Sequence, residues 1–287
     1  MNSLEFLNEV KSSTLCPKDF ETIYAEFQSF QNAALNTLRE VHRVCERNTI
    51  PYQVAYGSLL GLVRDGGQIP WDYDIDVFVP FEQKQNLINA LNKDLDKKFY
   101  FYCPEVNEKC RHMIMRITPV EYRTEAIHVD VFFFIGTPED PNERARYAEK
   151  IKKLSYDRYW KLVNLKEELL GNKTEIAKKF LRYKIPLACK SLKKITKEYN
   201  TLCAMYSSST STYCISADVF ATAETIPSSI LNETCLIECS YGIARIPVQY
   251  EKLLNLLYKD YKSVPPLKSR IDEVVTNHKR IKAFGKM

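Results

Sequence analysis

Three aspartates alternate with other residues between Asp72 and Val79, and this pattern constrains the fold more than any other part of the sequence. Side chains two residues apart point to the same face of a β-strand. A strand over residues 72–79 would therefore place Asp72, Asp74 and Asp76 on one face, with apolar side chains on the other. Because like charges in a row repel each other, the row is expected either to border solvent or to be neutralised by a cation.

A divalent cation is the neutralising group that fits this row best. Mg²⁺ takes oxygen ligands and binds through a few carboxylates together with substrate phosphates, and Mn²⁺ suits the same ligands. A calcium-binding loop that starts at Asp72 is excluded, because such a loop needs Gly and Glu where this chain has Val77 and Gln83. A solvated acidic strand is the alternative interpretation.

Gly57 and Ser58 form a second local signal. They follow a predicted strand at residues 52–56 and begin a short predicted helix that ends at Arg64. Backbone N–H groups at the start of a helix bind phosphate, and a glycine lets the phosphate approach closely. Half of the eight glycines of the chain lie within residues 57–67, which indicates that this stretch needs close backbone approach. An ordinary turn is the alternative.

Asp130 is the third candidate acid. It lies between Val129 and Val131 in a strand that is predicted to be buried. A carboxylate in a protein core is unfavourable unless it is paired or binds a metal ion. Beside Asp74 and Asp76, it would complete a three-carboxylate metal centre, and a buried structural acid is the alternative.

These residues also carry a resemblance to a known family. The chain reads G-S-L-L-G-L-V-R over 57–64 and I-P-W-D-Y-D-I-D over 69–76, and both segments resemble the LicD family. That family includes bacterial phosphorylcholine transferases and fukutin-related ribitol-phosphate transferases. A weaker similarity lies at residues 258–261. Two positions depart from the family pattern: Tyr73 stands where many relatives carry a further Asp, and Lys259 replaces a Gly.

The resemblance implies roles for the residues of these segments. Asp74 and Asp76 would bind Mg²⁺ or Mn²⁺ against the phosphates of a nucleotide-linked donor, with Asp72 as an additional ligand. Asp130 would be a third ligand, or the base that takes the proton of the acceptor hydroxyl. The residues implied in donor binding are Gly57, Ser58, Arg64 and Trp71.

Two of these donor-binding residues also have structural interpretations. Arg64 would instead pair with a carboxylate such as Asp65 or Asp72. Trp71 would pack its loop against the core, rather than stack on a base or on choline. The sequence alone leaves both questions open.

The implied activity is the transfer of a phospho-alcohol from a CDP-linked donor to a hydroxyl of a cell-surface glycan or a lipid-linked glycan. The phospho-alcohol would be phosphocholine, or else ribitol or glycerol phosphate. One alternative is a nucleotidyltransferase that acts on RNA or a small molecule, because Gly-Ser with Asp-x-Asp occurs across that superfamily. Another alternative is a non-catalytic binding protein with the same fold. The presence of Asp74, Asp76 and Asp130 argues against it, because a binding protein does not need a metal centre. With 41 basic and 36 acidic residues and no RNA-reading motif, no nucleic-acid partner is expected.

The order of the predicted elements gives an α/β (α+β) fold, with a mixed sheet and helical cover. The predicted helices lie at residues 21–48, 59–64 and 83–95. The predicted strands lie at 52–56, 72–79, 100–102, 113–117 and 126–135. The resemblance makes this core nucleotidyltransferase-like. The predicted regions are an N-terminal helical segment at 1–50, the catalytic core at 51–140, and a mainly helical, basic part packed on the core at 141–287.

The segment from Lys178 to Lys197 is rich in positive charge. It holds eight basic residues that are interleaved with apolar ones, and Pro186 divides it. One interpretation is a solvated pair of helices packed on the core. The other is a surface for an anionic membrane or a polyanionic glycan acceptor.

The predicted location is the cytoplasm, with a peripheral position at the inner face of the membrane as the alternative. The chain has no apolar run of transmembrane length, and its first residues lack the pattern of a signal peptide. Nine irregularly spaced cysteines are expected to be free thiols in such a compartment. Zinc at Cys235 and Cys239 is the less favoured alternative, because C-x₃-C is a loose match.

Overall fold

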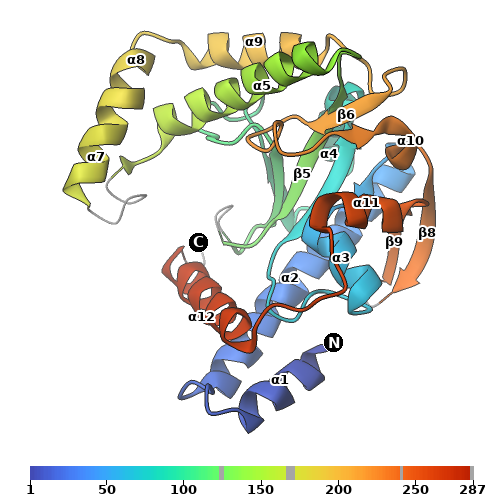
Figure 1. Ribbon diagram of the computed structural model, residues 1–287, viewed down its shortest axis with the longest axis vertical. Coiled ribbons are helices and arrows are strands. Elements are labelled where there is room, and N and C mark those ends of the chain that lie inside the picture. The colour runs from blue at the N-terminus through green and yellow to red at the C-terminus, as the bar shows by residue number, and fades with distance from the viewer. Residues whose placement is uncertain (123–125, 166–171, 240–241, 285–287) are drawn as a thin grey trace.

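The computed structural model describes residues 1–122, 126–165, 172–239 and 242–284 (Figure 1). Within these residues, a mixed seven-stranded sheet has the order β1-β2-β5-β4-β3, with β6 paired to β5 and β7 paired to β6. Its strands are β1 Gln53–Val54, β2 Ile75–Pro80, β3 Phe99–Tyr102, β4 Met115–Pro119, β5 Val129–Gly136, β6 Tyr213–Ser216 and β7 Ile226–Pro227. A separate two-stranded sheet is formed by β8 Thr234–Cys239 and β9 Gly242–Pro247. The predicted α/β class is confirmed.

Helices surround the sheet on both sides and at its upper end (Figure 1). The described helices are α1 Ser3–Ser12, α2 Phe20–Arg47, α3 Tyr56–Arg64, α4 Lys84–Asp94, α5 Pro141–Leu162, α7 Lys173–Lys179, α8 Ile185–Leu187, α9 Leu192–Cys203, α10 Ser228–Leu231, α11 Tyr250–Tyr258 and α12 Leu267–Phe284. A 3₁₀ turn, η1 Phe81–Gln83, precedes α4, and a π turn, η2 Phe180–Lys184, joins α7 to α8. The predicted helices at 21–48, 59–64 and 83–95 therefore exist, with boundaries shifted by a few residues.

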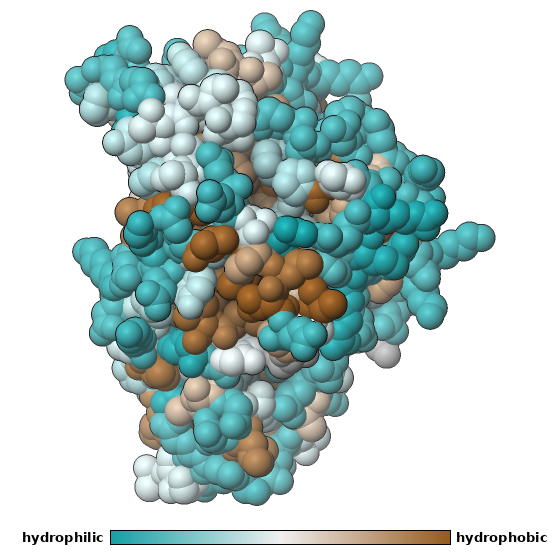
Figure 2. Space-filling view, turned by 90° about the vertical axis from the view of Figure 1, so that its right-hand side faces the viewer, coloured by the Kyte–Doolittle hydropathy of each residue, from teal (hydrophilic) through white to brown (hydrophobic). Residues whose placement is uncertain are grey.

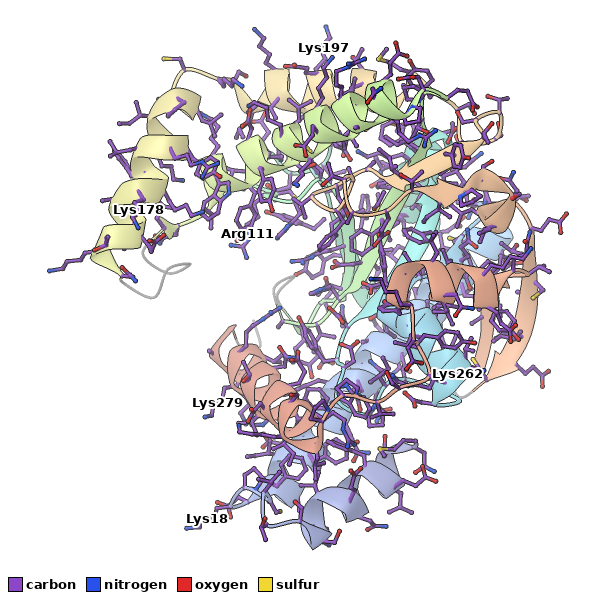
Figure 3. The ribbon with its side chains drawn as sticks, viewed as in Figure 1. Lys18, Arg111, Lys178, Lys197, Lys262 and Lys279 are labelled. Carbon is purple, nitrogen blue, oxygen red and sulfur yellow. The ribbon has the colours of Figure 1, made fainter. Side chains whose placement is uncertain are left out.

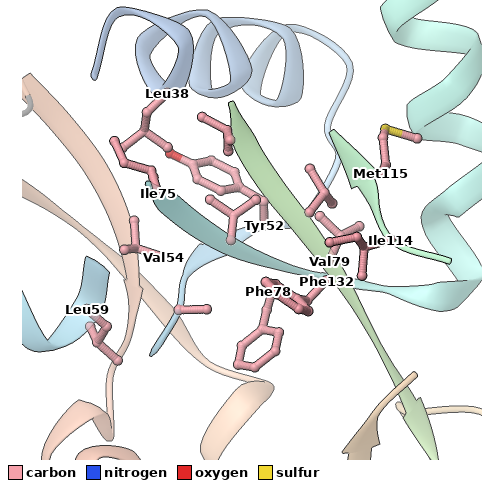
Figure 4. Close-up of a cluster of buried hydrophobic side chains, with 14 of the residues drawn as sticks. Leu38, Tyr52, Val54, Leu59, Ile75, Phe78, Val79, Ile114, Met115 and Phe132 are labelled. Carbon is pink, nitrogen blue, oxygen red and sulfur yellow. The ribbon is translucent and has the colours of Figure 1, made fainter. Parts of the chain in front are cut away.

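Helix α2 packs on one face of the sheet, because its apolar residues recur at the spacing of one helix face. Phe27 and Leu38 of this helix are buried. Side chains of β2 alternate in direction, so Ile75 faces α2 whereas Asp76 and Phe78 point to the opposite face. Figure 4 shows Leu38 and Ile75 on one side of β2 and Phe78 on the other. The face that carries Asp76 is thus the face that α2 leaves open.

Strand β5 is the centre of the sheet and is buried along its whole length. It pairs in parallel with β2, and antiparallel with β4 over Val129–Val131 and with β6 over Phe134–Gly136. Strand β6 therefore continues the position of β4 along the same edge of β5. Because β6 and β7 come from residues 141–287, this mainly helical part also extends the sheet. The predicted division into three regions stays a prediction.

Strand β2 begins at Ile75, and not at Asp72 as the alternation predicts. The backbone N–H of Asp72 donates to the carbonyl of Ile69 at 3.0 Å, which closes a turn. The side-chain amide of Gln31, on α2, donates to the carbonyls of Ile69 and Asp72 at 3.1 and 2.6 Å. These bonds hold the segment as a turn, so Asp72 and Asp74 lie in the loop that leads into β2.

Lys259, which departs from the family pattern, ends α11 in an unusual backbone conformation. Its φ angle is +54°. Side chains are disfavoured at positive φ and glycine is not, by about 1 kcal/mol or more. A glycine would therefore adopt the backbone conformation at this position with less strain than Lys259 does.

The surface shows one face with gathered apolar side chains. Figure 2 views the molecule from the side on which β8, β9 and α11 lie in Figure 1, and brown atoms cluster near the middle of that face. Exposed apolar side chains on these elements include Leu236, Ile243 and Leu256. In the part of the chain that the structure describes, no helix has the length and apolar character needed to cross a membrane.

Candidate functional site

A row of three charged residues crosses neighbouring strands on the open face of the sheet. Asp76 of β2 is in register with Asp130 of β5, which is in register with Arg116 of β4. Paired residues on adjacent strands point to the same face. Nε of Arg116 donates to Oδ1 of Asp130 at 2.8 Å, and Nε2 of His128 lies 3.5 Å from Oδ2 of Asp130. The structure thus brings Asp76 and Asp130 together.

Asp72 and Asp74 reach this row from the loop before β2. The Asp72 carboxylate lies against the backbone of Gly57, where an added Cβ would come within 2.9 Å of Oδ2. Burial and repulsion from Asp74 raise the pKa of Asp72 well above its ordinary value. Burial and repulsion from Asp74 and Asp130 do the same to the pKa of Asp76. These acids therefore resist joint ionisation unless a cation neutralises them.

Helix α3 presents its N-terminus beside the acidic loop. Ala55 gives this helix no side-chain cap, and Tyr56 begins it at a φ of +45°. The backbone N–H of Asp76 donates to Oγ of Ser58 at 2.9 Å, and its carbonyl accepts from the N–H of Ala55 at 2.9 Å. These bonds fix α3 against the start of β2. An uncapped helix N-terminus suits a phosphate, and donor contacts by Gly57 and Ser58 stay predictions.

Arg64 and Trp71 both contact other side chains of the protein. Nη2 of Arg64 donates to Oδ2 of Asp65 at 2.7 Å, and its guanidinium lies 5.5 Å from the centre of the Trp71 ring. Trp71 is buried, with its ring centre 5.4 Å from that of Phe6 and 5.2 Å from the guanidinium of Arg270. The structure therefore shows pairing with Asp65 for Arg64 and core packing for Trp71. Donor contacts by these two residues stay predictions.

Asp130 is held in its ionised form by its neighbours. Burial alone would raise its pKa, but attraction to Arg116 and His128 outweighs burial and holds the pKa of Asp130 below its ordinary value. A carboxylate with a low pKa is a weak proton acceptor near neutral pH. Of the two roles predicted for Asp130, this environment therefore favours metal binding or charge balance over that of a base.

The carboxylate oxygens of the site are the ligands that Mg²⁺ and Mn²⁺ prefer. Among the described residues, however, no group of three or more His, Cys, Asp or Glu side chains is arranged to hold a metal ion. The three-carboxylate centre is therefore not preformed. Mg²⁺ in nucleotide sites binds through one or two carboxylates, with substrate phosphates and water as the other ligands. The pair Asp74 and Asp76 fits such an ion, and metal binding stays a prediction.

The cysteines offer no second metal centre in the part of the chain that the structure describes. None of the nine forms a disulfide among the described residues. Cys235 and Cys239, the pair of the loose C-x₃-C match, belong to no group that is arranged for a metal ion. The sequence predicts reduced thiols for these cysteines, and zinc binding at Cys235 and Cys239 is the alternative.

Tyr56 connects the acidic row to a residue that sequence reasoning missed. Its ring centre lies 4.8 Å from that of Phe78 and 5.0 Å from that of Phe132, two residues beyond Asp76 and Asp130 on their strands. Its hydroxyl donates to Oε2 of Glu224 at 3.1 Å. Burial raises the pKa of Glu224. No motif marks this glutamate in the sequence.

Asp218 and Tyr258 were missed in the same way. Asp218 lies two residues after the end of β6 and is 4% exposed. The charges of Glu224 and Asp130 act on its carboxyl group. Burial raises the pKa of Tyr258, and the charges of Asp76 and Glu224 raise it further. Residues beyond 200 thus contribute carboxyl and hydroxyl groups to the same face. The resemblance at 258–261 is the only sequence signal that pointed toward any of them.

We expect Asp218 to make stability depend on pH. It accepts hydrogen bonds from the N–H of Phe220 at 2.6 Å and the hydroxyl of Ser216 at 3.2 Å, yet burial raises its pKa from 3.8 to about 7. Between these values the folded chain binds a proton that the unfolded chain has lost. The free energy of unfolding should therefore fall as pH rises from about 4 to 7, by up to about 4 kcal/mol.

The variant Asp218→Asn removes this titration while keeping the acceptor for Phe220. Urea unfolding at pH 5 and pH 8, in EDTA, measures both proteins. The difference in free energy of unfolding, variant minus wild type, should be a few kcal/mol larger at pH 8 than at pH 5. Groups that face Asp218, namely Glu224, Tyr56, Tyr199 and Asp130, are unchanged in the variant, so parallel pH profiles would contradict the prediction.

Comparison with known proteins bears on this arrangement. Residues 49–177 match the family model described as LicD/FKTN/FKRP, nucleotidyltransferase domain. The chain is also 29% identical over 119 residues to the lipopolysaccharide cholinephosphotransferase LicD of Haemophilus influenzae. That alignment covers 39% of this chain and 45% of the relative, so the chain spans less than half of the relative's length. The segment 49–177, which holds the acids of β2 and β5 and the N-terminus of α3, is therefore similar to the LicD/FKTN/FKRP nucleotidyltransferase domain.

Proposed function

We propose that this protein is a Mg²⁺- or Mn²⁺-dependent transferase. It moves a phospho-alcohol from a CDP-linked donor to a hydroxyl of a cell-surface glycan or a lipid-linked glycan. Phosphocholine is the first candidate for the transferred group, because the relative named above is a cholinephosphotransferase. Ribitol and glycerol phosphate are the others. The free cysteines are typical of a reducing compartment, and we propose a cytoplasmic location.

One observation carries this proposal. Asp74 and Asp76 lie beside the uncapped N-terminus of α3, and Ser58 ties the two together through the N–H of Asp76. A carboxylate pair and free backbone N–H groups are the two elements that bind the metal ion and the phosphates of a nucleotide. Both lie inside the matched segment 49–177.

The proposed reaction exchanges one bond at phosphorus for another. The acceptor oxygen bonds to the phosphorus that carries the alcohol, the bond from this phosphorus to the CMP oxygen breaks, and CMP leaves. A metal ion held by Asp74 and Asp76 would neutralise the phosphate charge. Backbone N–H groups at Gly57 and Ser58 hold the donor phosphate, and Arg116 balances the charge of Asp130. Asp218, with a pKa of about 7, is better suited than Asp130 to accept the hydroxyl proton.

The test is release of CMP by the purified protein. CDP-choline, CDP-ribitol and CDP-glycerol are offered separately with Mg²⁺, each with and without glycan acceptors, and CTP serves as the comparison. Release of CMP that depends on an acceptor and stops in EDTA supports the proposal. Release of diphosphate from CTP, with no reaction of any CDP-alcohol, would assign the site to nucleotidyl transfer instead.

A further inference from the structure

A helical arm, residues 173–187, projects from the upper end of the fold and comprises α7, η2 and α8 (Figure 1). One side of this arm is anchored. The ring of Tyr183 stacks on that of Trp160 at 5.0 Å between centres, and Leu187 is buried in the same cluster. Nζ of Lys184 donates to the carbonyls of Lys161 and Val163 at 2.9 and 2.7 Å, which caps the end of α5. The arm therefore has a fixed orientation on the protein.

The other side of the 173–187 arm exposes large apolar side chains. Phe180, Leu181 and Ile185 are 51%, 64% and 53% exposed. Different residues of the arm already fill its contact with α5, so these three have no place in the core. Several large apolar side chains exposed within six residues mark an interaction surface.

Positive charge lies beside these apolar side chains, on the arm and in the groove between the arm and α5. Lys178 and Arg182 are exposed on the arm itself. A cavity of about 590 Å³ runs from Arg182 and Pro186 to α5, and continues into one of about 770 Å³ between α5 and α9. Figure 3 shows Lys178 on the arm at the left of the molecule and Lys197 on α9 at its top.

Part of this charge is free to bind a partner. Lys190 is paired with Asp157, and Lys184 is used in the cap of α5. Among the described residues, neither Lys194 nor Lys197 forms an ion pair, and the ion pair of Lys178 with Glu175 is a surface pair of little strength. Basic side chains around exposed apolar ones are the pattern by which a helix lies in the interface of an anionic bilayer.

We propose that the 173–187 arm and the adjoining α5–α9 groove form a docking surface for an anionic lipid bilayer. Phe180, Leu181 and Ile185 insert into the lipid interface, and Arg182, Lys194 and Lys197 bind the phosphate headgroups. Seven basic and three acidic side chains line the groove, and this net positive charge favours anionic lipid over a neutral partner. This contact goes beyond the proposed transfer reaction and would hold the site near a lipid-linked acceptor.

The test is binding of the full chain to vesicles, which needs no catalytic activity. Vesicles of phosphatidylcholine alone are compared with vesicles that also contain phosphatidylglycerol, in low and high salt. One variant replaces Phe180, Leu181 and Ile185 by Ser, and a second replaces Arg182, Lys194 and Lys197 by Gln. The matched control replaces Lys18, Lys262 and Lys279 by Gln, which removes the same charge at positions outside the arm and the groove (Figure 3).

The wild type should bind only the anionic vesicles, and less as salt rises. The second variant should lose about fivefold in affinity for each cation removed, the first should lose at least as much in all, and the control should bind like the wild type. All the substituted side chains are exposed, so each variant should fold, and a melting temperature equal to that of the wild type confirms it. Equal binding to neutral and anionic vesicles, or an equal loss in the control, would overturn the proposal. So would self-association without lipid that the Ser variant abolishes, since the arm would then be a protein interface.

Discussion

Asp74→Asn and Asp76→Asn should each lower turnover by roughly a thousandfold or more, while the fold stays intact. A neutral amide cannot help to neutralise a metal ion that holds the donor phosphates. Without metal, the same change should leave the melting temperature unchanged or raised. The reason is that burial and repulsion from neighbouring acids already raise the pKa of Asp76, so removing a charge relieves the row.

The measurement pairs CMP release in Mg²⁺ with thermal melting in EDTA. Asp19→Asn is the matched control, because Asp19 is exposed at the start of α2 and its side chain makes no capping bond there. It should leave both readouts unchanged. A melting temperature of Asp74→Asn well below that of the wild type in EDTA would show that the acidic residues stabilise the fold. Turnover at the wild-type level in these variants would show that Asp74 and Asp76 take no part in the reaction.

Arg116→Met should lower the free energy of unfolding by about 3–5 kcal/mol at pH 8. The change leaves the carboxylate of Asp130 buried beside Asp76 without its 2.8 Å partner. Breaking a buried pair from one side costs this much because the remaining charge is uncompensated. In the wild type, Asp130 has a lowered pKa, so its contribution to stability is fully present above about pH 4 and is lost as the pH falls below that value toward the lower pKa of the folded state.

The double variant Arg116→Met with Asp130→Asn is the control for this prediction. It also lacks the other contacts of Arg116, but it has no buried charge left over. Urea unfolding should place its stability between those of the wild type and the single variant. The single variant should recover part of its loss at pH 5, where Asp130 can take up a proton. Identical stabilities of the single and double variants at pH 8 would show that the charge of Asp130 is not the cause.

The local parts of the fold could be predicted from the sequence. The period of apolar residues gave α2, and the alternation of acids with apolar residues gave the strand that starts at Ile75. A burial argument brought Asp130 to the site, because an acid between valines needs a partner. These inferences use neighbours within a few residues, and such patterns depend little on the rest of the chain.

The features that the sequence did not predict depend on contacts between distant segments. The strand was predicted to begin at Asp72, but Gln31 of α2 holds that segment as a turn. Arg116 became the partner of Asp130 through an antiparallel register that no spacing reveals. Asp218 reaches the site because β6 pairs with β5. In each case the deciding partner lies more than ten residues away in the sequence.

A unit of sequence relationship is not always a unit of folding, and the pairing of β6 with β5 shows the difference. The matched segment ends at residue 177, yet Phe134–Gly136 of β5 find their backbone partners on Cys214–Ser216. Without that later segment, an apolar stretch of the central strand would become an open edge, and such edges recruit other chains. The similarity to the family therefore covers the segment of the proposed site, whereas the backbone pairing that completes its central strand comes from a later part of the chain.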